Sequence, residues 1–408
     1  MLRKAARLIV LFAVAPAGFS QSRGAAIDAA AIPLRPVRVL VADELVQASI
    51  RFGGPLLIRG STGAIPLAPS DATSREIVLR ATPRGLEIGG RILPERDVYI
   101  EAGKDTITLV TPGENGSLES EFPGRLRVIS DDQLLIINEV ELEDYVASVV
   151  ASEIWPNFEV EAFRAQAIVT RTFVLYHMLR RSGALYDLAA TQSSQVYRGV
   201  RTDTVGRLAE EAAQYTRGLA CTWNDQGQDR IFCTYYSAAC GGMSQPAAPL
   251  GPEGDIAPLA GGVRCDYCRI APGQTYRWGP VRINLREVFE RVLEKYPEAL
   301  KLGAVRSMEA VELTRFGRPL TWRITGVSGE SMDIVAERFR LAVAPNLIRS
   351  TDCNVKVEGP DLVFEDGKGF GHGLGLCQWG MQGQAQEGKK AAQILRYYFP
   401  GSRLIRVY

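Results

Sequence analysis

The spacing of apolar residues changes near Val140, and this change constrains the possible folds more than any other feature. Between residues 36 and 135, apolar and polar residues alternate in stretches such as PVRVLVADELVQASIRF and RDVYIEAGKDTITLVT, with frequent turn signals. This pattern is typical of short antiparallel strands. From Val140 to about Arg181 the apolar residues instead recur at helical spacing, and Pro156 divides this stretch into two expected helices.

The rest of the chain mixes the two patterns. Helical spacing returns near GRLAEEAAQYTRG, NLREVFERVLEKY and VAERFRLAV, and strand patterns lie near DRIFCTYYSAACGG and at residues 311–313 and 322–325. Because strands and helices come in separate runs, the sequence predicts an α+β fold rather than a regularly wound α/β fold. We expect a β-rich N-terminal domain at residues 36–135 and a mixed helix and strand region at residues 136–408.

The net charge and the first residues bear on partners and location. The 408 residues include 47 basic and 46 acidic side chains, a formal net charge of +1, so no nucleic-acid partner is expected. Residues 1–24 combine early cations with an apolar segment from Leu8 that Pro16 and Gly18 interrupt, which predicts a secretory signal and export to the periplasm or cell wall. Membrane contact is expected only if this segment stays uncleaved as an anchor.

The seven cysteines leave their chemistry open. They fit an exported protein with some disulfides, although an odd number leaves at least one thiol unpaired. Cys265 and Cys268, in CDYC, could bind zinc together with Cys240, but one C-x-x-C pair is a weak signal. Both histidines lie far away in sequence, so disulfides or free structural thiols are the favoured interpretation, and we expect no metal and no other cofactor.

Glu153 lies on the apolar face of the first expected helix, in ELEDYVASVVASEIWP. At helical spacing Leu142, Val146, Val149 and Val150 project within roughly 60° of it. Acidic residues are almost never buried without a partner, so this carboxyl is a paired core group, a helix-end residue or a working acid. Burial would raise its pKa and keep it protonated, which suits a general acid at a glycosidic oxygen.

The second expected helix also carries polar groups on its apolar face. Gln166, Thr170 and His177 share this face, so Glu153, Gln166 and Thr170 could converge at the rim of a groove. The alternatives are local hydrogen bonds in a core and, for His177, a helix-end role. A mechanism with one carboxyl stays open, because the other nearby carboxyls mostly point off this face: Glu143, Asp144, Glu159 and Glu161.

The C-terminal segment GKGFGHGLGLCQWG has glycine at every second position from Gly367 to Gly375. In an extended chain these glycines would form a bare face, which implies close approach of a ligand or another backbone. The spacing does not make a dinucleotide fingerprint or a Walker A motif. His372 and Cys377 form no convincing thiol-hydrolase pair, whereas QVYRG and QWG supply aromatic and amide groups that could bind sugars.

These motifs resemble the stage II sporulation protein D family, also called the SpoIID/LytB domain. The stretches that carry the resemblance, from about Val140 to Leu404, are NEVELEDYVASVVASEIWPNFEVEAFRAQAIVTRTFVLYH, QVYRG, TRGLACTW, YYSAACGGMS and GKGFGHGLGLCQWGMQGQAQEGKKAAQILRYYFPG. The chain departs from the family pattern in two places. Ala189, Ser193 and Ser194 stand where some members bind zinc, and Tyr236 to Ala238 lack a histidine that members often have.

The resemblance implies a catalytic domain with a glycan-binding groove and the activity of a peptidoglycan lytic transglycosylase. Glu153 would protonate the bond between N-acetylmuramic acid and N-acetylglucosamine in glycan strands that lack stem peptides, and would then act as the base that closes a 1,6-anhydro product. The expected partners are these glycan strands, with a cell-wall amidase as a further candidate. The alternative function is a non-catalytic wall-binding or amidase-enhancer module. The residues expected to bind the glycan are Gln166, Gln195, Tyr197, His372, Gln378 and Trp379.

Overall fold

The structure is a computed structural model that describes residues 27–28, 35–66, 75–113, 116–191, 194–251 and 254–408. It contains several sheets and separate runs of helices, so the predicted α+β class is confirmed. The expected signal at residues 1–24 lies outside the described residues. Within the described ranges, no helix combines the length and the apolar character that a membrane span needs.

The N-terminal part consists of strands and turns in its described residues, as the alternation predicts. A six-stranded sheet has the order β11-β10-β3-β6-β7-β8, and a seven-stranded sheet has the order β14-β2-β13-β12-β9-β4-β5. One hydrophobic core receives the buried face of both sheets. The strands are β2 (Val37–Leu45), β3 (Gln47–Phe52), β4 (Leu57–Gly60), β5 (Gly63–Ile65), β6 (Glu76–Thr82), β7 (Gly85–Ile88), β8 (Arg91–Leu93), β9 (Asp97–Glu101), β10 (Ile107–Gly113), β11 (Gly116–Phe122), β12 (Arg125–Ser130), β13 (Leu134–Val140) and β14 (Leu188–Ala189).

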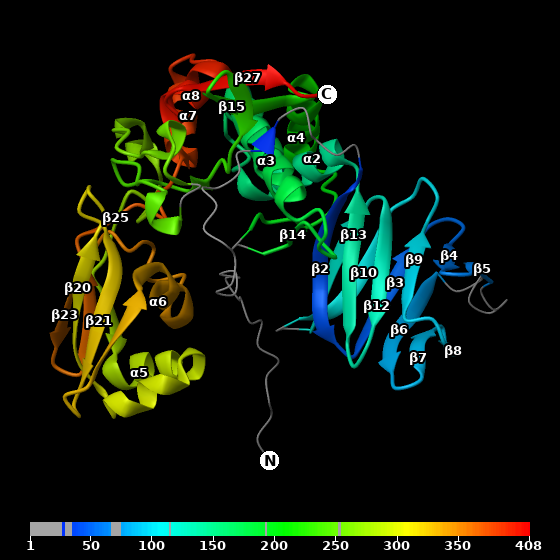
Figure 1. The fold of residues 1–408 in the computed structure, drawn as a ribbon, viewed down its shortest axis with the longest axis horizontal. Helices are drawn as coiled ribbons and strands as arrows, with labels where there is room; N and C mark the ends of the chain where they lie inside the picture. Colours follow the sequence, from blue (N-terminus) through cyan, green and yellow to red (C-terminus); the bar gives the residue numbers. More distant parts are fainter. Residues whose placement is uncertain (1–26, 29–34, 67–74, 114–115, 192–193, 252–253) are drawn as a thin grey trace.

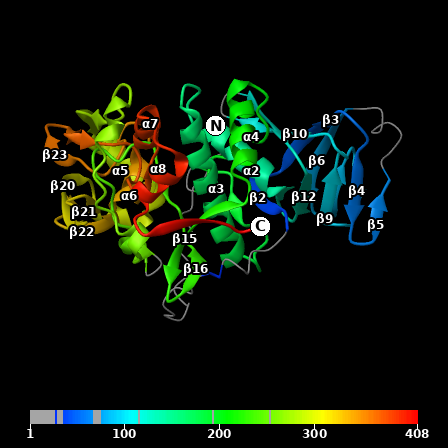
Figure 2. The same cartoon turned by 90° about the horizontal axis from the view of Figure 1, so that it is seen from above.

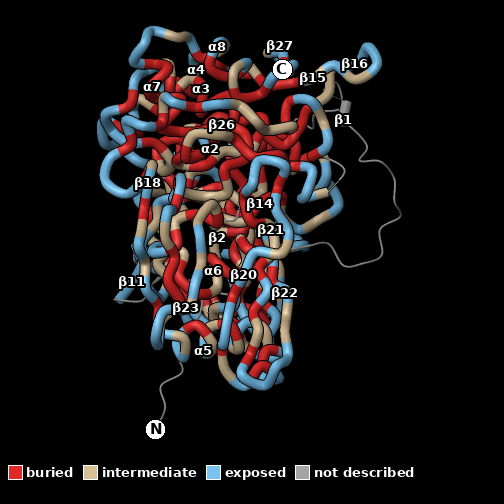
Figure 3. The backbone as a smooth tube through the Cα atoms, turned by 90° about the vertical axis from the view of Figure 1, so that its left-hand side faces the viewer, coloured by how far each residue is buried: buried red, intermediate tan, exposed pale blue. Residues whose placement is uncertain are grey.

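The central part surrounds the long helix α3 and lies beside the N-terminal sheets (Figure 1). Figure 3 shows that buried backbone is concentrated around its helices. The order of its small sheet is β1-β16-β15-β27. Its elements are β1 (Ile27–Asp28), α2 (Leu142–Glu153), α3 (Val160–Arg180), α4 (Thr204–Tyr215), β15 (Leu219–Asp225), β16 (Gln228–Ile231), β17 (Tyr236–Ser237), β26 (Leu376–Cys377), α7 (Gln378–Gln386), α8 (Ala391–Tyr398) and β27 (Ser402–Arg406), with short 3-10 turns at Ala248–Leu250, Ala257–Leu259 and Asp266–Ile270.

The strand β13 joins the N-terminal sheets to the helices. It crosses the expected boundary between residues 135 and 136, and almost all of its residues are buried. Tyr145 and Val149 of α2 and the C-terminal half of α3 pack into the same core as the strands. The start of α2 is therefore held in place by the sheet, and the far end of α2 carries Glu153.

A third part, with its own hydrophobic core, occupies residues 278–364. The chain enters and leaves it at one place, because β18 (Arg277–Trp278) pairs with β25 (Gly367–Lys368). Figures 1 and 2 show this part and the N-terminal sheets at opposite ends of the molecule, with α2 to α4 between them. Its elements are β19 (Val281–Asn284), α5 (Leu285–Lys295), the 3-10 helix Pro297–Leu302, β20 (Val305–Leu313), β21 (Pro319–Gly326), β22 (Ser331–Val335), α6 (Ala336–Val343), β23 (Asn354–Glu358) and β24 (Asp361–Glu365).

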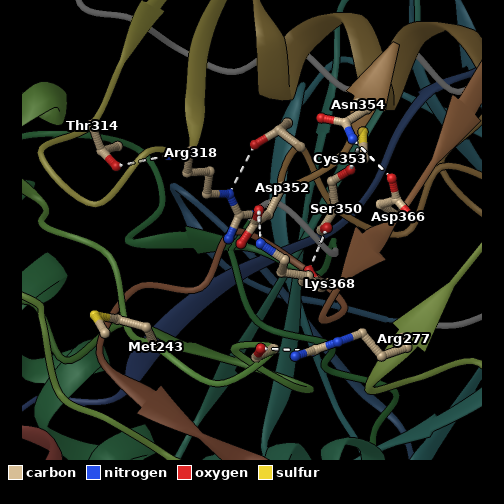
Figure 4. Close-up of polar contacts among 12 residues, drawn as sticks. Met243, Arg277, Thr314, Arg318, Ser350, Asp352, Cys353, Asn354, Asp366 and Lys368 are labelled. Carbon is tan, nitrogen blue, oxygen red and sulfur yellow. Dashed lines mark hydrogen bonds and ion pairs between the residues drawn. The ribbon is translucent and has the colours of Figure 1, made fainter.

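The buried residue Arg318 connects this third part to the glycine-rich segment. Its Nε donates to Thr351 Oγ1 at 2.8 Å, and its Nη2 donates to the carbonyl oxygen of Gly371. Figure 4 shows Arg318 and the hydrogen bond from its backbone N–H to Thr314 Oγ1. In β18, Arg277 Nη1 donates to the carbonyl oxygen of Gly241 at 2.8 Å. These contacts hold the backbone at Gly241 and at Gly371, in the two segments that also contain Tyr236 and Gln378.

Candidate active site around Glu153

Glu153 is the last residue of α2, and its carboxyl faces two other segments of the chain. The backbone N–H of Val196 and the hydroxyl of Tyr236 each donate to Glu153 Oε1, both at 3.0 Å. Val196 belongs to the loop that contains QVYRG, and Tyr236 lies in β17. Three segments that are distant in sequence therefore meet at one carboxyl.

The environment of Glu153 raises its pKa above the ordinary value of 4.5, and burial is the largest cause. Hydrogen bonds from Val196, Tyr236 and Gln378 and the positive charge of Arg198 oppose this effect and only partly offset it. Glu153 forms no ion pair with the residues that the structure describes. Of the three explanations open at the sequence level, a paired core carboxyl is therefore the one the structure disfavours.

Gln166 and Gln378 lie behind the carboxyl, in the protein interior. Gln378 Nε2 is 3.4 Å from the backbone oxygen of Glu153 and 3.5 Å from Gln166 Oε1. Gln166 is fully buried and also contacts Thr170 Oγ1 at 3.4 Å. Gln166 and Thr170, which were expected to converge with Glu153 at the rim of a groove, are linked to it only through Gln378 in the contacts among the described residues. Gln166 and Gln378 connect α2, α3 and α7 rather than face solvent.

Gln195 and Tyr197 have structural contacts that the sequence did not indicate. Gln195 Oε1 accepts a hydrogen bond from the hydroxyl of Tyr145 at 2.9 Å. Tyr197 donates to Asn138 Oδ1 at 2.6 Å, and its ring stacks on Tyr145 with centroids 5.1 Å apart. Both side chains are buried, so they support the loop that presents the Val196 N–H to Glu153.

An aromatic cluster adjoins the end of α2. The ring centroid of Trp155 lies 5.9 Å from that of Phe158 and 5.3 Å from that of Trp379. Trp155 is 40% exposed, whereas Trp379 is only 5% exposed. Trp155, two residues after Glu153, is therefore the solvent-exposed ring of this cluster, and Trp379 packs against it from the protein interior. The sequence motifs did not indicate Trp155.

His372 lies beside Tyr236 rather than against the Glu153 carboxyl. Its Nδ1 accepts a hydrogen bond from the Leu374 N–H at 3.0 Å, and the ring is also hydrogen-bonded to the Tyr236 backbone. Burial lowers the pKa of His372 to about 4. The imidazole is therefore neutral at pH 7 and, with Nδ1 as the acceptor, carries its proton on Nε2.

The lowered pKa values of His177 and His372 lead us to expect a loss of stability in weak acid. Burial also lowers the pKa of His177 to about 4, so its ring is neutral and does not serve as a helix-end cation. Both pKa values rise towards 6.5 on unfolding. As the pH falls below 6.5, the unfolded state therefore binds protons first, and stability decreases until about pH 4. We expect the melting temperature to fall across this range and the fall to be smaller in His177→Gln; an identical pH profile for the variant would contradict this assignment.

The glycine-rich segment is not the extended strand that its alternation predicts. Gly369, Gly371, Gly373 and Gly375 all have positive φ, between 63° and 95°, so the chain turns repeatedly between β25 and β26. The expected close approach of backbone is present. A Cβ on Gly369 would lie 2.4 Å from the Ala239 carbonyl oxygen, and one on Gly375 would lie 2.2 Å from the Tyr235 carbonyl oxygen.

Comparison of the sequence with known proteins links the chain to a family. The SpoIID model, described as Stage II sporulation protein, matches residues 130–223, which contain Glu153 and Val196. An uncharacterized protein of Brachyspira hyodysenteriae is 31% identical over 290 residues, or 70% of this chain and 72% of the relative. Stage II sporulation protein D of Bacillus subtilis is 25% identical over 294 residues, which cover 66% of this chain and 75% of the relative.

The chain belongs to the stage II sporulation protein D family. A shorter similarity links it to the amidase enhancer of Bacillus subtilis, at 30% identity over 74 residues, which cover 18% of this chain and 10% of that protein. Tyr236, His372 and Gln378 lie outside the residues that the family model matches. In this member of the family, the partners of Glu153 therefore come from both inside and outside the matched region.

The other carboxyls considered from the sequence do not assemble with Glu153. Glu143 is buried in an ion pair with Arg171. Glu161 binds Arg164 and accepts a hydrogen bond from the Ala391 N–H. Glu159 is exposed. Asp144 lies at the other end of α2, where partial burial and then nearby acidic residues raise its pKa. None of these four supplies a second carboxyl at the site.

Four cysteines gather near the site in a way the sequence did not predict. The sulfur atoms of Cys240, Cys265, Cys268 and Cys377 all lie within 4.8 Å of one another, and all four residues are buried. The first three are close enough in sequence to suggest a group, whereas more than a hundred residues separate Cys377 from them. This cluster is the group of residues here that could hold a metal ion.

Two cavities lie away from Glu153. One, of about 190 Å³, lies between α3 and α4 and is lined in part by Phe163, Leu208 and Tyr215. The other, of about 410 Å³, lies beside β18 and β25. Because Glu153 lines neither of them, the glycan-binding groove stays a prediction.

Proposed function

We propose that this protein is an exported lytic transglycosylase that cleaves peptidoglycan glycan strands without stem peptides. The observation that carries the proposal is the Glu153 carboxyl, whose pKa is raised by burial and which has hydrogen-bond donors but no ion-pair partner among the described residues. Membership of the stage II sporulation protein D family and the similarity to an amidase enhancer support a role at the cell wall.

In the proposed first step, Glu153 donates its proton to the oxygen that links N-acetylmuramic acid to the next N-acetylglucosamine. The hydrogen bonds from Val196 and Tyr236 both go to Oε1, which leaves Oε2 to carry the proton. The bond between C1 and this oxygen breaks, the leaving sugar keeps the proton as a hydroxyl, and positive charge develops at C1. The same donors stabilise the carboxylate that forms on Glu153.

In the second step, the carboxylate of Glu153 removes the proton from the C6 hydroxyl of the muramic residue. The O6 atom forms a bond to C1, which gives a 1,6-anhydro end and returns Glu153 to its protonated state. No water is consumed, so no second carboxyl is needed to activate one. The absence of a second carboxyl from the mechanism agrees with the positions of four nearby acidic residues. Glu143 and Glu161 are paired with arginines, and Asp144 and Glu159 lie away from Glu153.

The substrate and its preparation follow from the same proposal. Removal of stem peptides requires an amidase, so we propose that an amidase acts before this protein on the same strands. Export brings the protein to the wall, and residues 36–135 are proposed to be a β-rich part without catalytic groups. A groove beside Trp155 would let the glycan chain cross the end of α2.

The activity is tested by incubating the mature protein with glycan strands that lack stem peptides and analysing the fragments by mass spectrometry. Anhydro-muramic ends are the expected product. Reducing ends would mean hydrolysis and would contradict the proposal. Intact strands that bind the protein would instead favour the alternative module, which the similarity to the amidase enhancer suggests.

Substitution of Trp155 tests the proposed aromatic contact with the glycan. Trp155→Ala removes the exposed ring next to Glu153 but leaves the carboxyl and its donors in place. A lost stacking contact of about 1.4 kcal/mol corresponds to a tenfold weaker affinity. We expect the KM for glycan strands to rise about tenfold, and Trp155→Phe to restore part of it; an unchanged KM would place the glycan elsewhere.

Substitution of Tyr236 tests how the carboxyl is tuned. Tyr236→Phe removes a hydrogen bond that lowers the pKa of Glu153, so this pKa should rise further. Glu153 then stays protonated to higher pH, and its carboxylate form is less stabilised. We expect the alkaline limb of the pH–rate profile to move to higher pH and the maximal rate to fall about tenfold. A profile identical to that of the parent protein would show that Tyr236 does not act on Glu153.

A further inference from the structure

We propose that Cys240, Cys265, Cys268 and Cys377 form a structural zinc site that holds the Tyr236 and Gln378 segments together. In a tetrahedral site with Zn–S bonds of about 2.3 Å, neighbouring sulfurs are about 3.8 Å apart. The Cys240 and Cys268 sulfurs are 3.8 Å apart, and all six sulfur pairs fall within 4.8 Å. One metal ion therefore fits among the four sulfurs after only small adjustments.

The arrangement fits one metal ion better than two disulfides. All four thiols are free in the structure, and a pair of disulfides would not require every sulfur to lie close to the other three. Cys265 and Cys268 stand at the start of a 3-10 turn, Asp266–Ile270, and supply two ligands at the short spacing common in zinc sites. Cys240 and Cys377 supply the other two from separate segments.

Hydrogen-bond donors surround the sulfurs. The backbone N–H groups of Cys240 and Gly380 point to Cys377 Sγ, at 3.2 and 3.4 Å, and the hydroxyl of Tyr398 lies 3.0 Å from Cys265 Sγ. Such donors stabilise the negative charge of thiolate ligands. Gly380 permits this approach, because a Cβ there would lie 2.4 Å from Cys265 Sγ.

The position of the cluster indicates a structural role. Four protein ligands fill a tetrahedral zinc ion and leave no position for substrate. Ser237 pairs with Cys377 between β17 and β26, Tyr236 lies next to Ser237, and Gln378 follows Cys377. The metal would therefore join the strand that carries a donor to Glu153 to the start of α7. This inference does not depend on the transglycosylase activity.

Zinc is the metal we infer, because tetrahedral sulfur sites hold zinc or iron and four buried cysteines close this site. An iron–sulfur cluster would also have to place sulfide between its irons. The four sulfurs here converge on a single point. The departure from the family pattern at Tyr236 to Ala238 does not leave Cys240 isolated, since its neighbours are the other three cysteines.

Metal analysis of the full chain tests the inference. We expect about one zinc per chain in the purified protein by inductively coupled plasma mass spectrometry, and seven titratable thiols after denaturation with chelator and without reductant. Cys377→Ser should retain less than a tenth of the zinc. Cys353→Ser is the matched control, since Cys353 is a free cysteine of the third part, outside the cluster, and it should retain all of the zinc.

Cobalt replacement covers the case in which Cys377→Ser does not fold. The parent protein loaded with Co²⁺ should show the intense visible bands of tetrahedral thiolate coordination. Three titratable thiols without metal would establish two disulfides and overturn the inference. It would also be overturned by iron in place of zinc, by seven thiols with no uptake of zinc or cobalt, or by full zinc content in a folded Cys377→Ser variant.

Discussion

Glu153→Gln is expected to abolish the production of anhydro-muramic ends while the fold stays intact. Positioned general acid–base groups contribute about 10²- to 10⁴-fold to rate, and here one group serves both steps, so the loss should reach the upper end of that range. The glutamine oxygen can still accept the hydrogen bonds from Val196 and Tyr236. Activity is measured as anhydro ends released per minute from peptide-free glycan.

The same variant should be more stable than the parent protein at neutral pH. The pKa of Glu153 is raised in the folded state above its unfolded value, so the folded protein loses stability as the pH rises through the folded pKa. Glutamine does not ionise and avoids this cost. The melting temperature of Glu153→Gln should exceed that of the parent at pH 8, and the difference should vanish near pH 4.

Glu159→Gln is the matched control, because Glu159 is an exposed carboxyl six residues further along the same connection. It should leave the activity equal to that of the parent. Full activity in Glu153→Gln would contradict the proposed role of Glu153. Equal stability of Glu153→Gln and the parent at every pH would contradict the raised pKa of its carboxyl.

Arg171→Met is expected to cause the largest loss of stability. Arg171 Nε and Nη2 bind the two oxygens of Glu143 at 2.9 and 2.6 Å, and the guanidinium also donates to the carbonyl oxygens of Ala213 and Leu219. Arg171 is fully buried and Glu143 nearly so. Removal of one member leaves the other charge buried without its partner, which costs about 3–5 kcal/mol of unfolding free energy.

Two further variants separate this effect from a general response to substitution. Arg171→Met combined with Glu143→Gln removes both charges and should recover a large part of the loss, since replacing a whole buried pair is often close to neutral. Arg286→Met breaks the exposed Arg286–Glu290 pair and should cost less than about 0.5 kcal/mol. Denaturant unfolding measures all three; a cost below about 1 kcal/mol for Arg171→Met would contradict the assignment.

Local patterns in the sequence were sufficient to predict the elements. The alternation in residues 36–135 and the helical spacing after Val140 correspond to the observed strands and to α2 and α3. These patterns follow from which face of an element is buried, and they depend only on neighbouring residues. The position of Glu153 at the end of α2 was predictable for the same reason.

Features set by contacts between distant residues were not predictable in this way. The glycines from Gly367 to Gly375 have the period of a strand. Gly369, Gly371, Gly373 and Gly375 nevertheless have positive φ angles, because the chain turns against the 235–241 segment. Tyr197 looked like a sugar-binding residue because its motif gives no sign of the packing with Tyr145. Tyr236 and the family motif around it were visible, but its hydrogen bond to Glu153 spans 83 residues.

The source of the oxygen at the new glycan end tests the central claim most directly. Peptide-free glycan strands are digested in water enriched in ¹⁸O, and the masses of the new muramic ends are measured. If Glu153 directs the C6 hydroxyl to C1, the ends carry no ¹⁸O and the fragment masses sum to that of the intact strand. Ends that contain one ¹⁸O atom and the added mass of water would show hydrolysis and contradict the proposed mechanism.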